Sequence, residues 1–390
     1  MARLGDICEK VTDYVASGSF AALKENVLIT NEENYAIMVK TADFSNGFTK
    51  ALTYTDKRGY DFLKNSNLFG GELILSNIGS IGKVFKVPYL DRPMTLASNT
   101  VMIKTATPEL TDYLYYYFLS PAGYKSLLSI SSGTSMLKFN KTELKKLEIP
   151  IPDIDKQRRI IAVMDKVSNL ISLRKQQLAK LDELVKARFV ELFGDTILNP
   201  FGWKKDLLGT VCDVRDGTHD SPQYYESGYP LVTSKNVTGG KIDLTDCSLI
   251  CEADFKKINE RSKVDIGDII MPMIGTVGKP VIVDIEPNFA IKNVSLIKFK
   301  ADSRVLNIYI RALLQSDYFD DAVLSKVRGG TQKFISLGDI RKLEVLVPPM
   351  ELQEQFATFI KQTDKSKVAV QKALDEAQLL FDSLMQKYFG

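Results

Sequence analysis

Two short glycine loops carry groups that suit phosphate oxygens. One reads Gly-Ser-Ile-Gly-Lys over residues 79–83, and the other reads Gly-Thr-Val-Gly-Lys over residues 275–279. Each would expose backbone N–H groups, a hydroxyl and a lysine, which together bind phosphate. A plain glycine turn gives the same spacing, so both interpretations stay open. The candidate phosphate contacts are Ser80, Lys83, Thr276 and Lys279.

Other polar clusters lie beside runs that have the composition of β-strands. Arg, Lys, Asn and Gln can read base edges through pairs of hydrogen bonds, so we treat them as candidate DNA contacts. Taken one at a time, such residues are more often solvated surface positions. The candidates in these clusters are Lys40, Thr41, Thr134, Lys138, Ser234, Lys235, Arg328, Thr331, Gln332 and Lys333.

The single histidine, His219, limits the chemistry of the chain. It excludes a His-rich zinc site and a two-histidine metal helix, and a His-based triad would need further residues in a pattern that this chain lacks. Thr218 and His219 lie in the stretch Asp-Gly-Thr-His-Asp-Ser-Pro, where the histidine contacts a phosphate or a base, or else caps a turn beside Asp220. The sequence contains no Walker-type loop and no G-x-G-x-x-G before a helix. We therefore expect no catalytic residue, no metal ligand and no cofactor bound by this chain.

The composition is typical of a globular chain with two or three units. Hydrophobic residues make up 45% of the 390 residues and charged residues 25%. The net charge is +3, so a polyanion would be bound by local patches and not by bulk charge. The four cysteines form no disulfide scaffold, and we expect buried, reduced thiols. With no apolar run of about 18 residues and no signal-peptide pattern, we expect a cytoplasmic protein.

The sequence contains an internal repeat with a period of about 196 residues. Gly-Glu-Leu-Ile-Leu-Ser from Gly71 matches Gly-Asp-Ile-Ile-Met-Pro from Gly267, and both lead into the glycine loops. Asn99 and Asn293 follow at nearly the same interval, and from Leu144 and Ile340 onward the copies align without a gap. Between these anchors the copies diverge, which indicates one scaffold that carries two different surfaces.

Each copy combines a globular part with a long helix. The globular parts, expected at 1–150 and 195–347, alternate short β-rich runs with turns and contain a few helices, which predicts an α+β fold. The helices, expected at 151–194 and 348–390, open after prolines and then run without Pro or Gly. The sequence therefore predicts two heads, two helices and a pseudo-twofold internal repeat.

The long helices show the spacing of a coiled-coil seam. The first seam comprises Ile160, Met164, Val167, Ile171, Leu178, Leu181, Val185 and Leu192, with polar breaks at Arg174 and Arg188. The second comprises Phe356, Ile360, Val370, Leu374, Ala377, Phe381, Leu384 and Tyr388, with breaks at Thr363 and Lys367. We expect the two helices to pack on each other antiparallel and to hold the heads apart. Roughly 36 residues give about 54 Å, or about one and a half turns of B-DNA. The alternative is that each helix packs on its own head.

The whole chain resembles the specificity subunit of Type I restriction–modification systems. The stretch at 216–243, DGTHDSPQYYESGYPLVTSKNVTGGKID, looks like the opening of that family's target recognition domain. The segments IPIPDIDKQRRI and VPPMELQEQFATFI look like its proline-to-helix junction, with Gln157 and Gln353 at the usual glutamine. The ending LFDSLMQKYFG is similar to the family's second helix. The first head lacks the DGTH-type stretch, which makes its early loops harder to place.

The resemblance implies a DNA-recognition subunit that is not itself an enzyme. Each head would read half of a bipartite, asymmetric site on double-stranded DNA, and the helices would set the spacing. Two modification subunits would dock on the helices, bind S-adenosylmethionine and methylate adenine, while restriction subunits would use ATP and magnesium. The candidate docking and junction residues are Gln157, Arg158, Gln353 and Phe356.

Two other readings compete with this one. A coiled-coil adaptor without direct DNA readout would use the helices alone, and exchanging its heads would leave its function unchanged. An enzyme would need a cluster of carboxylates, and the Asp and Glu residues form no repeated, spaced motif.

Overall fold

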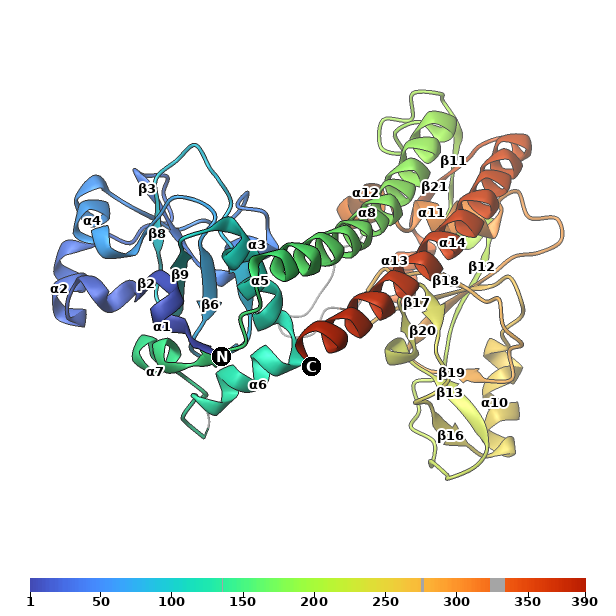
Figure 1. The fold of residues 1–390 in the computed structure, drawn as a ribbon. Helices are drawn as coiled ribbons and strands as arrows, with labels where there is room; N and C mark the ends of the chain where they lie inside the picture. The colour runs from blue at the N-terminus through green and yellow to red at the C-terminus, as the bar shows by residue number, and fades with distance from the viewer. Residues whose placement is uncertain (135, 275–276, 323–333) are drawn as a thin grey trace. The chain divides into compact units, whose positions relative to one another are not determined.

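The computed structural model describes residues 1–134, 136–274, 277–322 and 334–390 (Figure 1). The chain forms two compact units, one of residues 1–175 with 372–390 and one of residues 176–371. Each unit contains a globular head and half of each long helix. We call residues 1–153 head 1 and residues 194–349 head 2.

Head 1 is built on two four-stranded sheets. The first sheet is antiparallel and has the order β2 (Cys8–Asp13), β9 (Thr100–Thr105), β6 (Leu73–Ser76) and β7 (Val84–Lys86). The second has the order β4 (Tyr54–Thr55), β3 (Ala36–Val39), β8 (Met94–Leu96) and β5 (Asn67–Leu68). In this sheet β3 and β8 are parallel. The strands β6 and β3 are buried throughout, as expected for strands covered on both faces.

Head 2 repeats the antiparallel sheet strand for strand and the second sheet without a counterpart of β5. Its antiparallel sheet has the order β12 (Asp213–Asp216), β20 (Val294–Lys298), β17 (Ile269–Pro272) and β18 (Val281–Ile282). Its second sheet has the order β16 (Ser248–Ile250), β13 (Tyr229–Val232) and β19 (Ala290–Ile291), with β13 and β19 parallel. Head 2 adds the hairpin of β14 (Val237–Thr238) and β15 (Lys241–Ile242). The predicted internal repeat is therefore a repeat of fold.

Short helices and two small strand pairs complete the heads. Head 1 has α1 (Leu4–Ile7), α2 (Phe20–Asn26), α3 (Thr41–Ser45), α4 (Lys57–Phe62), α5 (Pro108–Leu119), α6 (Pro121–Ser129) and α7 (Lys141–Lys146). Head 2 has α9 (Leu208–Val211), α10 (Glu252–Ser262), α11 (Asn307–Leu313), α12 (Asp317–Ala322) and α13 (Leu337–Arg341). The strand pairs are β1 (Ala2–Arg3) with β10 (Glu148–Ile149), and β11 (Lys204–Leu207) with β21 (Glu344–Val347).

One buried tyrosine in each head fixes a helix to the strand that precedes the long helix. The hydroxyl of Tyr113 on α5 donates to the carbonyl of Pro150 at 2.8 Å. The hydroxyl of Tyr309 on α11 donates to the carbonyl of Leu346 at 2.9 Å. Both pairs are separated by 37 residues. The duplication thus preserves a buried hydrogen bond, because a buried phenol needs a partner.

The long helices are α8 (Ile154–Phe193) and α14 (Met350–Phe389), each of 40 residues. At roughly 1.5 Å per residue each is about 60 Å long, about one turn longer than the expected 36 residues. Every apolar position of the predicted seams is buried or half-buried. The limits of 1–150, 151–194, 195–347 and 348–390 stay a prediction as domain boundaries.

The helices pair antiparallel within each unit. In the first unit, Met164 near the start of α8 shares a core with Met385 and Phe389 near the end of α14. In the second unit, Phe189 near the end of α8 packs against Phe356 near the start of α14, with ring centroids 5.6 Å apart. These cores also contain the strands and helices of each head. The helices therefore pack on each other, as expected, and each also packs on a head, which was the alternative.

The polar breaks in the seam make specific contacts in the second unit. Lys367 Nζ lies 2.7 Å from Asp182 Oδ1 and joins the two helices. Arg188 pairs with Glu191 at 2.8 Å, and its guanidinium lies 5.9 Å from the ring centroid of Phe359. Such exposed pairs contribute little stability, so the apolar seam carries most of the helix pairing.

Replacing Phe356 with alanine should destabilise the second unit by about 3–5 kcal/mol, because the ring is fully buried and its loss leaves a cavity. Urea unfolding of the full chain, followed by circular dichroism, measures this. The matched control is Val368→Ala on the same helix, where the side chain is 71% exposed and a change within about 0.5 kcal/mol is expected. Equal effects of the two substitutions would contradict the packing described for α14.

Candidate nucleic-acid interface

In head 1, three loops meet at the edge where β6 ends and β9 begins. The backbone N–H of Asn77, just after β6, donates to the carbonyl of Asn99 at 3.2 Å. The side-chain amide of Asn77 donates to the carbonyl of Phe139 at 3.2 Å, and the N–H of Phe139 returns a bond at 3.1 Å. Asn99 holds a left-handed backbone with φ of 67°, a conformation that asparagine tolerates better than most residues. This edge positions the predicted phosphate loop.

The first glycine loop lies beside the loop that carries Thr134 and Lys138. The N–H of Gly79 donates to the carbonyl of Leu137 at 3.0 Å, and Ile78 forms a β-bridge with Lys138. The four predicted contact residues of these loops are exposed; they are Ser80, Lys83, Thr134 and Lys138. The structure therefore brings together two loops that lie more than 50 positions apart in sequence, and it leaves these four side chains accessible.

The second glycine of each loop is required by the fold itself. Gly82 has φ of 88°, and a Cβ there would lie 2.3 Å from the ring of Tyr124. Gly278 has φ of 83°, and a Cβ there would lie 2.5 Å from the ring of Phe319. Tyr124 lies on α6, which follows α5, and Phe319 lies on α12, which follows α11. The contact is therefore present in both copies of the repeat. The glycine turn is thus structural, while the exposed lysines, including Lys279, remain free for a ligand.

Each head caps the end of its central strand with a buried polar side chain. After β3, the N–H of Lys40 donates to Asp43 Oδ2 at 2.7 Å, and burial raises the pKa of Asp43. After β13, the N–H and hydroxyl of Thr233 both donate to Asn236 Oδ1 at 3.0 Å. The predicted contacts lie around these caps, and their accessibility differs: Lys235 is exposed, whereas Lys40, Thr41 and Ser234 are half-buried.

The ammonium group of Lys40 is directed into its own head, where it donates to the hydroxyl of Thr53. A DNA contact through Lys40 would have to compete with that bond. Its predicted role in DNA binding stays a prediction.

In head 2, the stretch that contains Thr218 is tied to the turn between β19 and β20. The N–H of Thr218 donates to the carbonyl of Ile291 at 3.0 Å, and the N–H of Asn293 donates to the carbonyl of Thr218 at 3.2 Å. The N–H of Lys292 bonds the carbonyl of Val232 at the end of β13 at 2.9 Å. Thr218 and His219 therefore lie at the same edge as the cap that precedes Lys235.

His219 is held from both sides of its ring. Its Nε2 lies 2.9 Å from Asp216 Oδ2, and its Nδ1 lies 2.9 Å from Asn293 Oδ1. The bond to Asn293 and, to a smaller extent, the bond to Asp216 raise the pKa of His219 above its usual value. The side chain is 60% exposed, so the ring is fixed and accessible at once. Neither Asp216 nor Asn293 was among the predicted site residues, although Asn293 was recognised as an anchor of the repeat.

Several predicted contacts lie outside the described residues. They are Thr276, Arg328, Thr331, Gln332 and Lys333. The described residues next to them are paired, because Ile274 forms a β-bridge with Phe334 and the N–H of Ile335 donates to the carbonyl of Met273 at 2.9 Å.

The two glutamines at the helix junctions act inside their own units. The amide of Gln157 donates to the carbonyl of Pro152 at 2.8 Å, and that of Gln353 donates to the carbonyl of Pro348 at 2.9 Å. Gln353 and Phe356 are fully buried. Arg158 is exposed and pairs with Glu109 at 3.0 Å. These contacts tie each helix start to the strand before it, and the role of the four residues in subunit docking stays a prediction.

The cysteines depart in part from expectation. All four are free thiols, but only Cys212 is buried, and the other three are half-buried. Burial raises the pKa of Cys8 and of Cys212 to about 12, so both are unreactive as thiolates. Cys247 donates to the carbonyl of Asp243 at 3.7 Å, which a half-exposed loop position allows.

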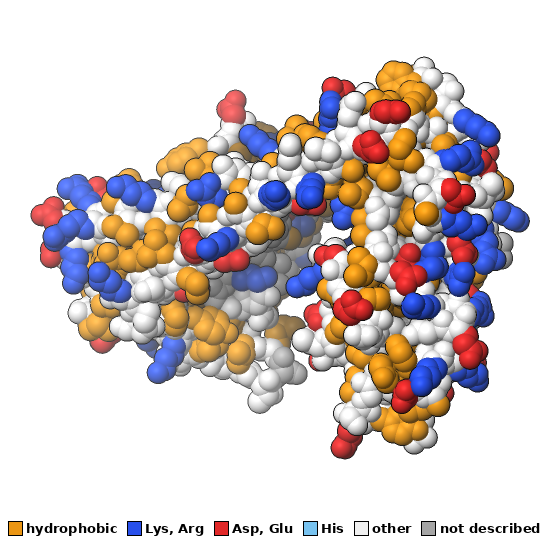
Figure 2. Space-filling model, turned by 90° about the vertical axis from the view of Figure 1, so that its right-hand side faces the viewer, with side chains coloured by type: hydrophobic (Ala, Val, Ile, Leu, Met, Phe, Trp, Pro, Cys, Tyr) orange, Lys and Arg blue, Asp and Glu red, His pale blue; other side chains and the backbone are white. Residues whose placement is uncertain are grey.

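The charged side chains outside these loops are mixed in sign on one face of the molecule. On the face shown in Figure 2, basic and acidic side chains alternate over the molecule. Among the described residues, no group of three or more His, Cys, Asp or Glu side chains is placed to hold a metal ion. No helix in the described part of the chain has the length and apolarity to span a membrane.

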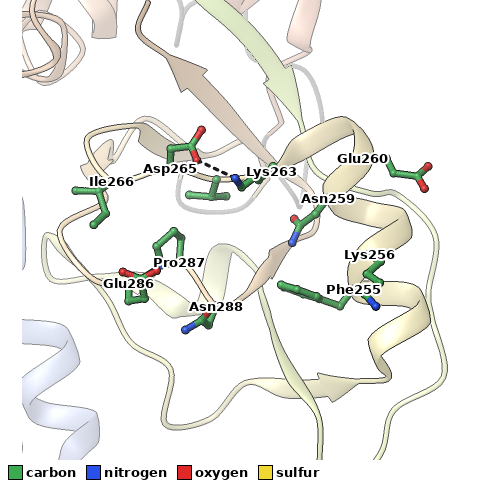
Figure 3. Close-up of a pocket in the computed structure, with 11 residues that line it drawn as sticks. Phe255, Lys256, Asn259, Glu260, Lys263, Asp265, Ile266, Glu286, Pro287 and Asn288 are labelled. Carbon is green, nitrogen blue, oxygen red and sulfur yellow. Dashed lines mark ion pairs between the residues drawn. The ribbon is translucent and has the colours of Figure 1, made fainter.

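An open cavity of about 660 Å³ lies in head 2 between α10 and the turns around Asp265 and Pro287 (Figure 3). Its rim carries both charges, with Lys263 3.6 Å from Asp265. None of the predicted contact residues lines this cavity. A polyanion would meet as much repulsion as attraction at this rim. The cavity is therefore not a favourable nucleic-acid site.

Comparison with protein families gives two matches along the chain. Residues 1–183 and residues 200–377 both match the family described as "Type I restriction modification DNA specificity domain". The matched stretches correspond to the two copies of the internal repeat.

Individual relatives agree with this match. The chain is 25% identical over 345 residues to the Type I restriction enzyme MjaIX specificity subunit of Methanocaldococcus jannaschii, covering 81% of this chain and 76% of that protein. It is 24% identical over 378 residues to the MjaVIII specificity subunit of the same organism, covering 90% and 86%. A crystal structure of a Type I restriction–modification S subunit from M. genitalium has a TM-score of 0.54 at 15% identity, covering 100% and 95%. This last likeness confirms the fold.

Replacing Gly82 with alanine should destabilise head 1 by about 2–4 kcal/mol, because left-handed backbone strain adds to a clash with Tyr124. Gly79→Ala is the matched control, since Gly79 has φ of 76° but nothing within 4 Å of a Cβ. It should cost only about 1–2 kcal/mol. Thermal unfolding of the full chain measures both. Adding Tyr124→Ala to Gly82→Ala should recover the difference, and no recovery would argue against the ring contact.

Proposed function

Because the chain belongs to the family of Type I restriction modification DNA specificity domains, we propose that each of its heads reads one half of a bipartite DNA site. The observation that carries this proposal is the repeated edge in both heads, where exposed lysines and polar side chains gather on fixed loops. The strands behind these loops are buried and rigid, as a scaffold for recognition needs. The chain itself positions DNA and performs no chemistry.

The two half-sites differ, which makes the whole site asymmetric. The heads share strand order, but head 1 follows its central strand with α3 and adds β5, whereas head 2 follows it with the β14–β15 hairpin. Different side chains and different loop shapes at the same edge present different donors and acceptors to the major groove. One scaffold thereby serves two sequences.

The long helices set the distance between the half-sites and dock two modification subunits. Exposed apolar side chains support a docking role, since Leu173 on α8 is 56% exposed and Leu379 on α14 is 69% exposed. The modification subunits supply S-adenosylmethionine and adenine methylation, and restriction subunits supply ATP- and magnesium-dependent chemistry.

The near-neutral charge of the chain shapes this proposal. Phosphate contacts dominate the affinity of most DNA-binding proteins, and a net charge of +3 provides few of them. The chain alone therefore binds DNA modestly, and the modification subunits complete the basic channel. A coiled-coil adaptor without DNA readout would need none of the exposed lysines on the loops.

Methylation mapping tests the proposal directly. We expect that co-expression of this chain with its neighbouring modification subunit, followed by single-molecule sequencing of the host genome, reveals methyladenine in a two-part motif with an unread gap. Exchanging head 1 for that of a relative should change one half of the motif and leave the other half intact. A soluble, assembled complex that methylates nothing, or a motif unchanged by the exchange, would favour the adaptor.

Replacing Lys83 with glutamine should weaken DNA binding to all sequences alike, because a phosphate contact carries no base information. The slope of log affinity against log salt should fall by about 0.9, the contribution of one phosphate. Fluorescence anisotropy of labelled duplexes with the assembled complex measures this. Lys57→Gln is the control, since Lys57 is also exposed but pairs with Asp61 on α4. A loss confined to one sequence would reassign Lys83 to base contact.

A further inference from the structure

A buried carboxylate at the edge of head 2 contacts two exposed basic side chains. The side chain of Asp216, at the end of β12, is 8% exposed. One of its oxygens accepts from Arg261 on α10, and the other lies 2.9 Å from His219 Nε2. His219 and Arg261 are 60% and 66% exposed. Both oxygens of this buried acid are thus engaged by basic side chains that lie at the surface.

The opposite side of the histidine ring is fixed by Asn293. Its Oδ1 lies 2.9 Å from His219 Nδ1, and its left-handed backbone with φ of 55° is held by the bond to Thr218. Both ring nitrogens therefore face oxygen acceptors. A neutral imidazole has one N–H and can donate to only one of them, whereas the imidazolium donates to both. The geometry fits the charged ring.

The remaining groups around His219 do not reverse this preference. Arg261 opposes protonation of His219, but Asp216 lies between the two and favours it. Lys292, from the turn that carries Asn293, is occupied by the hydroxyl of Ser221 at 2.7 Å. Asp220 is the next residue in the chain and is exposed. Together the contacts raise the pKa of His219, the bond to Asn293 contributing most and the bond to Asp216 next.

With both N–H groups used inside the protein, His219 has none left to read a base edge. What it offers outward is a rigid ring with a positive charge, and a phosphate oxygen is attracted by charge without needing that N–H. A base contact through hydrogen bonds would require the ring to break away from Asp216 or Asn293.

We propose that Asp216 and Asn293 are positioning residues that hold His219 as a cation against a DNA phosphate in the half-site read by head 2. The contact weakens as the pH rises, because the ring loses its charge. Head 1 has no histidine, so its contacts do not change in this way. This inference rests on the proposed reading of DNA by the two heads.

The test uses the full chain assembled with its modification subunits and a duplex that carries the mapped methylation motif. Affinity is measured at about 50 mM and about 200 mM salt, near pH 6 and near pH 8. Near pH 6, His219→Gln should lower the slope of log affinity against log salt by about 0.9. Raising the salt from the lower to the higher concentration should then reduce the affinity of wild type by a factor about three times larger than for the variant. Near pH 8 the difference between the two proteins should be smaller than near pH 6, because the ring loses its charge as the pH rises. Lys256→Gln, a change of an exposed lysine paired with Glu252 on α10, is the control and should match wild type.

A second measurement follows the ring itself. As the only histidine, His219 gives a single imidazole Cε1–H resonance in the full chain, so its titration is read without assignment. Its midpoint should lie above about 6.5 and should fall in Asp216→Asn. The inference is overturned by a midpoint at or below about 6.5, or by equal salt slopes for wild type and His219→Gln near pH 6. In either case a mapped bipartite motif would still support the proposed function. Absence of any motif overturns the proposed function first.

Discussion

The burial of an apolar seam between two long helices is the constraint on which both units depend. Neither α8 nor α14 could bury its apolar face alone, and each does so against the other and against a head. In the second unit, Phe189, Phe356 and Tyr309 belong to one core, so helix and head are a single packed body. The strand edge that carries the recognition loops is therefore fixed to the helices by close packing, and close-packed interiors transmit position accurately.

Duplication explains how one such body can serve two sequences. What repeats is what the core needs: the strand order, the tyrosine-to-carbonyl bond, the junction glutamine, and the glycine that faces an aromatic ring. What differs lies outside these fixed points, in α3 and the β14–β15 hairpin. Because these fixed points hold the core together, the loop positions outside them can vary with less effect on the stability of the head.

Recognition by a nearly neutral chain has to rely on a few well-placed charges. Lys83, Lys235 and Lys279 are exposed on loops that the fold holds in place. In head 2 the histidine adds a charge that depends on protonation and on the buried Asp216. A few positioned charges thus take the place of the large net positive charge of many DNA-binding proteins. Partner subunits can then add to the affinity for DNA.

The sequence by itself determined the repeat, the α+β class, the two long helices and their seams, because periodicity and duplication are properties of the chain. It also found the glycine loops and the DGTH stretch. It did not find Asp216, Asn77 or Asn293 as parts of the site, nor the internal bond that occupies Lys40. Those depend on which segments meet at a strand edge and on which side of a loop each side chain lies. The bonds of Asn77 to Phe139 and of Asn293 to His219 join residues more than 50 positions apart, and no local spacing encodes them. The bonds of His219 to Asp216 and of Lys40 to Thr53 are closer in sequence, but they depend on loop conformations that the spacing alone does not fix.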